Sequence, residues 1–192
     1  MLEDEQKLVK RAKDGEVEAF GLLYDYYLPK IYRFVLLKVS HREEAEDLTH
    51  QAFLKAWENI NQYNFKGYSF GSWLYKIAKN MTVDYYRSFR AEISAEEISD
   101  ISSEDTPFVS IDRKIEWDGL IKAIKQLKEV EQDVLIMRFV EDLSLKEVSE
   151  AINKSEGAVK IIQHRAINNL KKEIFVSEDP VRDKISNGEE RK

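Results

Sequence analysis

Apolar side chains recur every three to four residues along almost the whole chain, and this periodicity restricts the fold more than any other feature. Such spacing places apolar groups on one side of an α-helix. Only 7 glycines and 3 prolines interrupt the 192 residues, and no strongly apolar run typical of a strand is present. The sequence therefore predicts an all-α fold, with helices near 3–13, 16–38, 42–60, 70–90, 112–127, 130–141, 144–152 and 156–175.

An acidic, serine-rich segment separates two groups of these helices. Residues 91–112, AEISAEEISDISSEDTPFVSID, contain acidic residues throughout and no lysine or arginine. Like charges extend such a segment, and its serines and Pro107 disfavour a packed helix. We therefore expect two small helical domains, at 1–91 and 112–176, joined by a flexible acidic linker at 92–111 and followed by a polar tail at 177–192.

Composition limits the class of protein. The net charge of −6 disfavours indiscriminate nucleic-acid binding, because lysine and arginine supply most of the affinity for phosphates. The absence of cysteine excludes disulfides and thiolate metal sites. The N-terminus MLEDEQKLVK lacks the order of a secretory signal, and no apolar run approaches the roughly 18 residues that span a bilayer. We expect a soluble cytoplasmic protein with no membrane insertion and no cofactor.

Residues 144–175 predict a helix-turn-helix arrangement. Ser144 is followed three residues later by Glu147, which is the pattern of a capping box. Ser155 then caps a second helix after a turn at Asn153 and Lys154. The inward side of this second helix is expected to consist of Val159, Ile162, Ala166 and Leu170.

The remaining arc of the second helix is cationic and partly apolar. It includes Gly157, Lys160, Ile161, His164, Arg165, Asn168, Lys171 and Lys172. Cations suit phosphates, histidine and asparagine suit base edges, and an exposed isoleucine can touch a thymine methyl group. These residue types favour an interface that reads duplex DNA, although an ordinary solvated helix face has charges of the same kind.

The helix expected at 70–90 has a cationic stripe beside its apolar face. The stripe consists of Lys76, Lys79, Arg87 and Arg90, with Asn80 at its edge. In the preceding segment YNFKGYSF, aromatic residues alternate with Lys66 and small polar residues. Because any base can stack on an aromatic ring for about 1–3 kcal/mol, this loop and stripe suit single-stranded nucleic acid. The alternative is that some rings close the core, as we expect of Phe70.

The segment 41–60, HREEAEDLTHQAFLKAWENI, which contains the helix expected at 42–60, has a clustered acidic face. Its outward residues are Glu43, Glu44, Glu46, Asp47, His50, Gln51 and Lys55. In a nucleic-acid-binding protein, such a face is expected to point away from DNA and toward a protein partner. Metal binding is the weaker alternative, because nothing in the sequence supplies a closed set of ligands.

These three segments, in this order, resemble the extracytoplasmic-function (ECF) group of bacterial sigma factors. AEDLTHQAFLKAW is similar to their region 2.2, FKGYSFGSWLYKIAKNMTVDYYR to regions 2.3 and 2.4, and LKEVEQDVLIMRFVEDLSLKEVSEAINKSEGAVKIIQHRAINNLKK to region 4. The resemblance implies a subunit that binds core RNA polymerase and directs it to promoter DNA. It implies that the minus-ten element is held as single-stranded bases and the minus-thirty-five element as duplex.

The resemblance also implies roles for individual positions. Contacts with the polymerase clamp would come from Asp47, Leu48, His50 and Gln51. Contacts with the minus-ten strand would come from Phe65, Lys66, Tyr68, Lys76, Asn80 and Arg87. Contacts with the minus-thirty-five duplex would come from Lys160, Ile161, His164 and Arg165. The family also makes an anti-sigma partner an expectation.

One pair of residues departs from the family pattern. Where the family usually has Gln-Glu after AEDLT, this chain has His50 and Gln51, so a carboxylate expected to pair with a clamp arginine is missing. The charged contact is therefore expected to be weaker, or to shift to Asp47 or Glu44.

Two other functions fit parts of the sequence. A stand-alone helix-turn-helix repressor or activator would dimerise on paired half-sites and would have little use for the loop aromatics. A small nuclease would need a catalytic group, but the chain has no phosphate-cradling glycine loop and its three histidines are scattered. We interpret the sequence as that of a sigma factor and not of an enzyme.

Overall fold

The computed structural model describes residues 4–65, 69–92 and 119–178. Regular structure in these ranges is helical, which confirms the expected all-α fold. The elements are α1 (Glu5–Lys13), α2 (Val17–Val39), α3 (Arg42–Glu58), η1 (Ile60–Gln62), α4 (Phe70–Glu92), α6 (Glu129–Leu135), η2 (Ile136–Val140), α7 (Leu145–Ala151) and α8 (Glu156–Glu178). Residues 119–125 are also helical. Apart from their first residues, the expected linker at 92–111 and tail at 177–192 lie outside the described residues.

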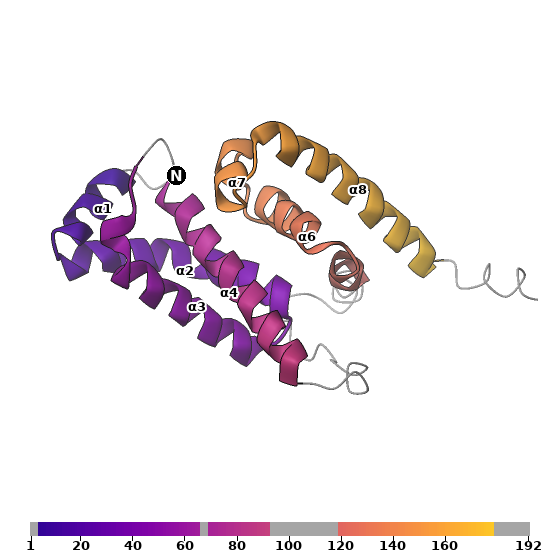
Figure 1. Cartoon of the computed structure of the whole chain (residues 1–192), viewed down its shortest axis with the longest axis horizontal. Helices are drawn as coiled ribbons and strands as arrows, with labels where there is room; N and C mark the ends of the chain where they lie inside the picture. The colour runs from indigo at the N-terminus through magenta and orange to yellow at the C-terminus, as the bar shows by residue number, and fades with distance from the viewer. Residues whose placement is uncertain (1–3, 66–68, 93–118, 179–192) are drawn as a thin grey trace, which may run out of the picture.

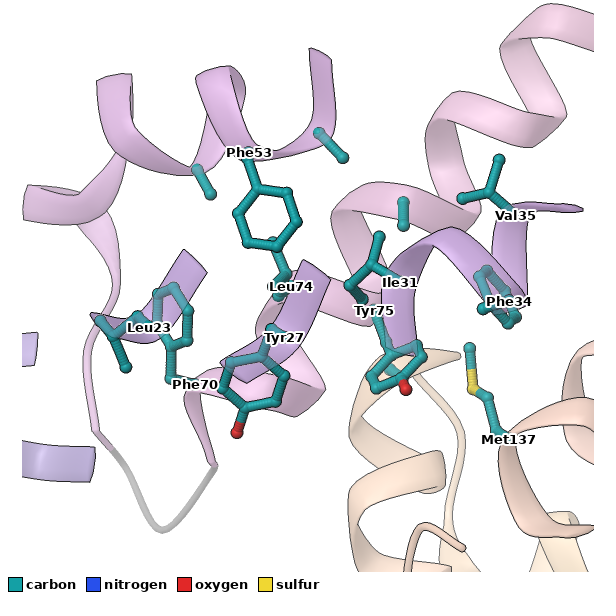
Figure 2. Close-up of a cluster of buried hydrophobic side chains, with 14 of the residues drawn as sticks. Leu23, Tyr27, Ile31, Phe34, Val35, Phe53, Phe70, Leu74, Tyr75 and Met137 are labelled. Atoms are coloured by element: carbon teal, nitrogen blue, oxygen red, sulfur yellow. The ribbon is translucent and has the colours of Figure 1, made fainter. Parts of the chain in front are cut away.

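The first unit consists of α1 to α4, with α2 at its centre (Figure 1). Leu23, Ile31 and Phe34 of α2 recur at helical spacing and are completely buried. α3 faces them with alanines at positions 45, 52 and 56, which are also completely buried and allow the two helices to approach closely. Leu74 and Phe70 of α4 complete the same core (Figure 2).

The helix expected at 42–60 ends earlier, at Glu58. Asn59 follows it, and its side-chain amide donates a 2.8 Å hydrogen bond to the carbonyl of Lys55. Such side-chain bonds to the backbone compete with helix continuation. The chain then makes one short 3-10 turn, η1, and enters the segment that leads to α4.

The second unit consists of α6, η2, α7 and α8. The helix expected at 130–141 is divided, because its last turn, Ile136–Val140, widens into a π-helix. α6 packs along α8, where Leu127, Leu135 and Ala166 form a small buried cluster. Within the described ranges, none of the helices is both long enough and apolar enough to span a membrane.

The two units pack against each other, which the sequence did not predict. Their buried residues form one continuous cluster that includes Phe34, Tyr75, Met137 and Val148. Figure 2 shows Met137 of η2 pointing toward Phe34 of α2 and lying near Tyr75 of α4. Tyr75 is completely buried. The two expected domains therefore exist as helical groups, but the structure joins them through an apolar interface.

Candidate nucleic-acid and protein interfaces

The helix-turn-helix expected at the C-terminus is confirmed by α7 and α8. The Glu147 backbone N–H donates to the Ser144 Oγ at 3.2 Å, and the Ser144 N–H donates to the Glu147 carboxylate at 2.8 Å, which completes the capping box. The turn passes through Asn153, whose φ of 54° is left-handed. Asparagine tolerates that conformation better than most residues. Ser155 then accepts a 3.2 Å hydrogen bond from the N–H of Ala158 and caps α8.

The outer face of α8 lies open to solvent. The four residues expected to contact duplex DNA are all exposed: Lys160, Ile161, His164 and Arg165. Ile161 is 55% exposed although its side chain is apolar. On the opposite side, Val159 and Ala166 are completely buried, as expected. The helix therefore presents cations and one isolated apolar group together on an accessible face.

Arg138 fixes α8 relative to the loop that precedes α7. Its guanidinium donates to the carbonyl of Leu143 and, at 3.3 Å, to the side-chain oxygen of Gln163 in α8. Sequence reasoning missed this residue, because an arginine in a mostly apolar helix gives no local indication of its partners. By joining both segments, Arg138 helps to hold the angle between α8 and the rest of the unit.

Part of the cationic stripe of α4 is also accessible. Lys76, Asn80 and Arg87 are exposed, and Arg87 makes only a loose, 3.7 Å pair with Asp84, which is exposed as well. Phe65, in the segment before α4, is 49% exposed. Lys66 and Tyr68, which were expected to act beside it, lie outside the described residues.

Two other aromatic residues of this segment belong to the core. Phe70 is completely buried, which confirms its expected role. Tyr63 is only 5% exposed and packs on Phe70 and Trp73, with ring centroids 5.8 and 5.3 Å away. Burial is the main cause of the raised pKa of Tyr63. Of the described aromatics in YNFKGYSF, Phe65 is therefore the one available to a ligand.

A buried carboxylate from α1 holds the start of α4. Glu5 is 6% exposed and accepts a 2.8 Å hydrogen bond from the backbone N–H of Phe70. It also accepts one from the Tyr27 hydroxyl of α2. A carboxylate at this position satisfies a free N–H of the first turn and complements the helix dipole. Burial is the largest cause of the raised pKa of Tyr27, followed by the nearby charge of Glu5.

Gly71 allows the first turn of α4 to lie close to the Tyr27 ring of α2. A Cβ added at Gly71 would lie 2.8 Å from the Tyr27 hydroxyl oxygen, which is closer than real Cβ contacts. The first turn of α4 therefore rests directly on the Tyr27 ring. Sequence reasoning missed both Glu5 and Gly71, because their partners are far away along the chain.

The outer face of α3 matches the expected protein-binding face in part. Asp47, His50 and Gln51 are exposed on it. Leu48, which the resemblance assigns to the same contact, is only 8% exposed and belongs to the core cluster. The helical period that directs Ala45 and Ala52 inward also buries Leu48, so it supports the face from beneath. Among the described residues, no three histidine or acidic side chains gather as metal ligands.

Comparison with known proteins matches each of the two helical units to a known family. Residues 23–92 match sigma-70 region 2, and residues 123–172 match sigma-70 region 4. The chain is 36% identical over 167 residues to the ECF RNA polymerase sigma factor BldN of Streptomyces coelicolor, covering 85% of this chain but 63% of BldN. It is 31% identical over 166 residues to the RNA polymerase sigma factor YlaC of Bacillus subtilis, covering 83% of this chain and 94% of YlaC.

A solved structure supports the same fold. It is the co-crystal structure of the sigma factor RpoE in complex with the anti-sigma factor NepR from Bartonella quintana. The match has a TM-score of 0.68 and 21% identity, and it covers 82% of this chain and 97% of the matched chain.

The two regions, in this order on a helical fold, define a protein of the sigma-70 type. Within that class, the chain belongs to the ECF group of RNA polymerase sigma factors and acts in transcription initiation. Sigma factors are DNA-binding regulators and not enzymes.

Proposed function

We propose that this sigma factor binds core RNA polymerase through α3 and directs it to promoters by contacting two DNA elements. The minus-ten strand would lie against Phe65 and α4, and the minus-thirty-five duplex against α8. The observation that supports this most directly is the exposure of Phe65, in the segment before α4, and of Lys76 on α4 itself. An exposed ring can stack on a base, and exposed cations can contact the phosphates of the same strand.

On the minus-ten surface, each residue has a chemical role. Phe65 would stack on an unpaired base, and Tyr68 would do the same. Lys66, Lys76 and Arg87 would contact phosphates, while the amide of Asn80 would hydrogen bond a base edge or a phosphate.

On the minus-thirty-five surface, α8 would enter the major groove, which admits an α-helix. Lys160 and Arg165 would contact phosphates or guanine, His164 would hydrogen bond a base edge, and Ile161 would contact a thymine methyl group. The exposure of all four side chains on one face of α8 supports this arrangement.

For the polymerase contact, the proposal retains Asp47, His50 and Gln51, with Leu48 supporting them from the core. Because Gln51 replaces an expected carboxylate, Asp47 or Glu44 would supply the negative charge. A net charge of −6 is compatible with this function, because a DNA-binding subunit mounted on a polymerase can leave many phosphate contacts to its partner. The solved relative complexed with an anti-sigma factor suggests a partner of that class for this chain as well.

The experiment that tests the proposal is promoter-specific transcription with purified core polymerase. The chain should co-elute with core enzyme on size exclusion, and a double variant, Lys160→Ala with His164→Ala, should lose upstream protection in footprinting. Lys10→Ala, an exposed change in α1, is the matched control and should protect both elements. Normal upstream protection by the double variant would remove the role assigned to α8, and failure to co-elute would favour a stand-alone regulator.

A further inference from the structure

One helix, α1, contacts both ends of the segment that carries Phe65. At the first end, the Lys13 ammonium donates a hydrogen bond to the backbone carbonyl of Tyr63, the residue after η1, and lies 5.7 Å from the centroid of its ring. At the other end, the Glu5 carboxylate accepts a 2.8 Å hydrogen bond from the Phe70 N–H. Glu5 and Lys13 are the first and last residues of α1. Their backbones are therefore about 12 Å apart along the helix axis.

The segment depends on such contacts, because its backbone has little regular structure of its own. Residues 63–65 and 69 belong to no helix or strand, so tertiary contacts must fix their positions. At the base of the segment, the rings of Tyr63 and Phe70 meet edge to face with centroids 5.8 Å apart. Ser69 accepts a 3.1 Å hydrogen bond from the Ser72 N–H and caps α4. Lys13 and Glu5 connect this base to α1.

The position of α1 is in turn set by the core of the first unit. Val9 and Ala12 are only 4% and 2% exposed and pack into that core. After α1, Gly15 turns the chain into α2 with a left-handed φ of 93°. Arg11 donates two hydrogen bonds to the Glu16 carboxylate across this turn, at 2.5 and 2.8 Å. Because exposed ion pairs contribute little stability, the apolar contacts chiefly determine where α1 lies.

Phe65 lies beside this support. It lines a pocket of about 460 Å³ whose walls also include Glu5 and Gln6 of α1. Phe65 follows Tyr63 by two residues, so the direction in which the backbone leaves Tyr63 sets where the Phe65 ring points. Lys13 holds the carbonyl from which that direction starts.

We propose that Glu5 and Lys13 are positioning residues for minus-ten recognition. By fixing the two ends of the segment, they hold the Phe65 ring in the orientation that stacks on an unpaired base, without touching DNA themselves. A ring held in advance binds a base without the loss of backbone freedom that a loose segment would suffer. This inference rests on the proposed function of Phe65 and extends it to a helix that precedes the region 2 match, which begins at residue 23.

Lys13 is the residue to replace in the test. Glu5 is 6% exposed and its loss should destabilise the core, whereas Lys13 is half-buried at the surface. Lys13→Ala removes the donor to the Tyr63 carbonyl, and Lys13→Arg keeps a cationic donor there. Lys10→Ala is the matched control, because it removes the same charge from an exposed position of the same helix.

Proteolysis of the full-length chain measures whether the segment is held. Chymotrypsin cleaves after accessible aromatic residues, and cleavage of a native chain reports local opening. Cleavage after Phe65, identified by fragment mass, should be about tenfold faster in Lys13→Ala, the order expected when about one residue of backbone is released. Lys13→Arg and Lys10→Ala should be cleaved at the wild-type rate. Equal cleavage of Lys13→Ala and wild type would overturn the holding of the segment by Lys13.

Strand opening by the holoenzyme measures whether the held position matters. The probe is a promoter fragment that wild-type holoenzyme selects from a random-sequence DNA library. Lys13→Ala should slow strand opening, followed by permanganate, about tenfold while upstream protection in footprinting stays normal. A general loss of structure would reduce both signals. Loss of both signals together, or normal opening despite faster cleavage, would overturn the positioning role.

A double variant tests whether Lys13 acts through the Phe65 ring. If it does, Lys13→Ala added to Phe65→Ala should open DNA no more slowly than Phe65→Ala alone. Additive losses would overturn the inference, because Lys13 would then act independently of the ring. If Phe65→Ala alone opens DNA at the wild-type rate, the proposed function of Phe65 fails, and the cleavage rates still decide whether α1 holds the segment.

Discussion

Replacing Glu5 tests whether a single carboxylate from α1 positions the start of α4. Glu5→Ala removes the acceptor for two buried donors, the Phe70 backbone N–H and the Tyr27 hydroxyl. Phe70 is 0% and Tyr27 is 5% exposed, so water cannot easily replace the lost acceptor. A buried donor without a partner lowers the free energy of unfolding by about 1–3 kcal/mol, so two such donors should lower it by about 2–6 kcal/mol.

This loss is large compared with the stability of a small protein. Whole domains unfold with roughly 5–15 kcal/mol, so Glu5→Ala should remove a substantial part of that free energy. For a unit of about 60–100 residues, 1 kcal/mol lowers the melting temperature by roughly 4–8 °C, so we expect a decrease of about 8 °C or more. Glu5→Gln keeps one amide oxygen as an acceptor, so its loss should be about half as large.

Urea unfolding followed by tryptophan fluorescence provides the measurement. Trp73 contacts Phe70 and Tyr63, with centroids 5.6 and 5.3 Å away, so its emission reports on this part of the core. Glu18→Ala, an exposed change at the start of α2, is the control and should change the unfolding free energy by less than about 0.5 kcal/mol. If Glu5→Ala matched that control, the reasoning about the buried acceptor would be wrong.

Three further changes have definite expected outcomes. Gly71→Ala should destabilise the first unit by about 1–3 kcal/mol in urea unfolding, because the new methyl group meets the Tyr27 hydroxyl; equal stability would show that the Tyr27 ring can move aside. Ser144→Ala should lower the unfolding free energy by about 1 kcal/mol through loss of the α7 cap, whereas Ser144→Thr should retain most of the stabilisation that the cap provides. Gln51→Glu should bind core polymerase more tightly than wild type in a competition assay; equal or weaker binding would contradict the proposed clamp contact.

Local signals in the sequence predict most of the helices and the helix-turn-helix motif. The three-residue spacing of Ser144 and Glu147 is sufficient for a capping box, because both partners lie in the same turn. Helical periodicity likewise predicts the burial of Phe70 and Val159. Helical spacing from Ala45 and Ala52 also accounts for the burial of Leu48.

Contacts between distant residues could not be predicted in this way. Lys38 and Asp133 are 95 positions apart, and Glu5 and Phe70 are 65 apart. No local pattern indicates which of many carboxylates meets a given lysine or N–H. Tyr75 illustrates the consequence, because its complete burial depends partly on the second unit. The sequence therefore predicts the accessible faces of α4 and α8, but not the packing that covers part of α4.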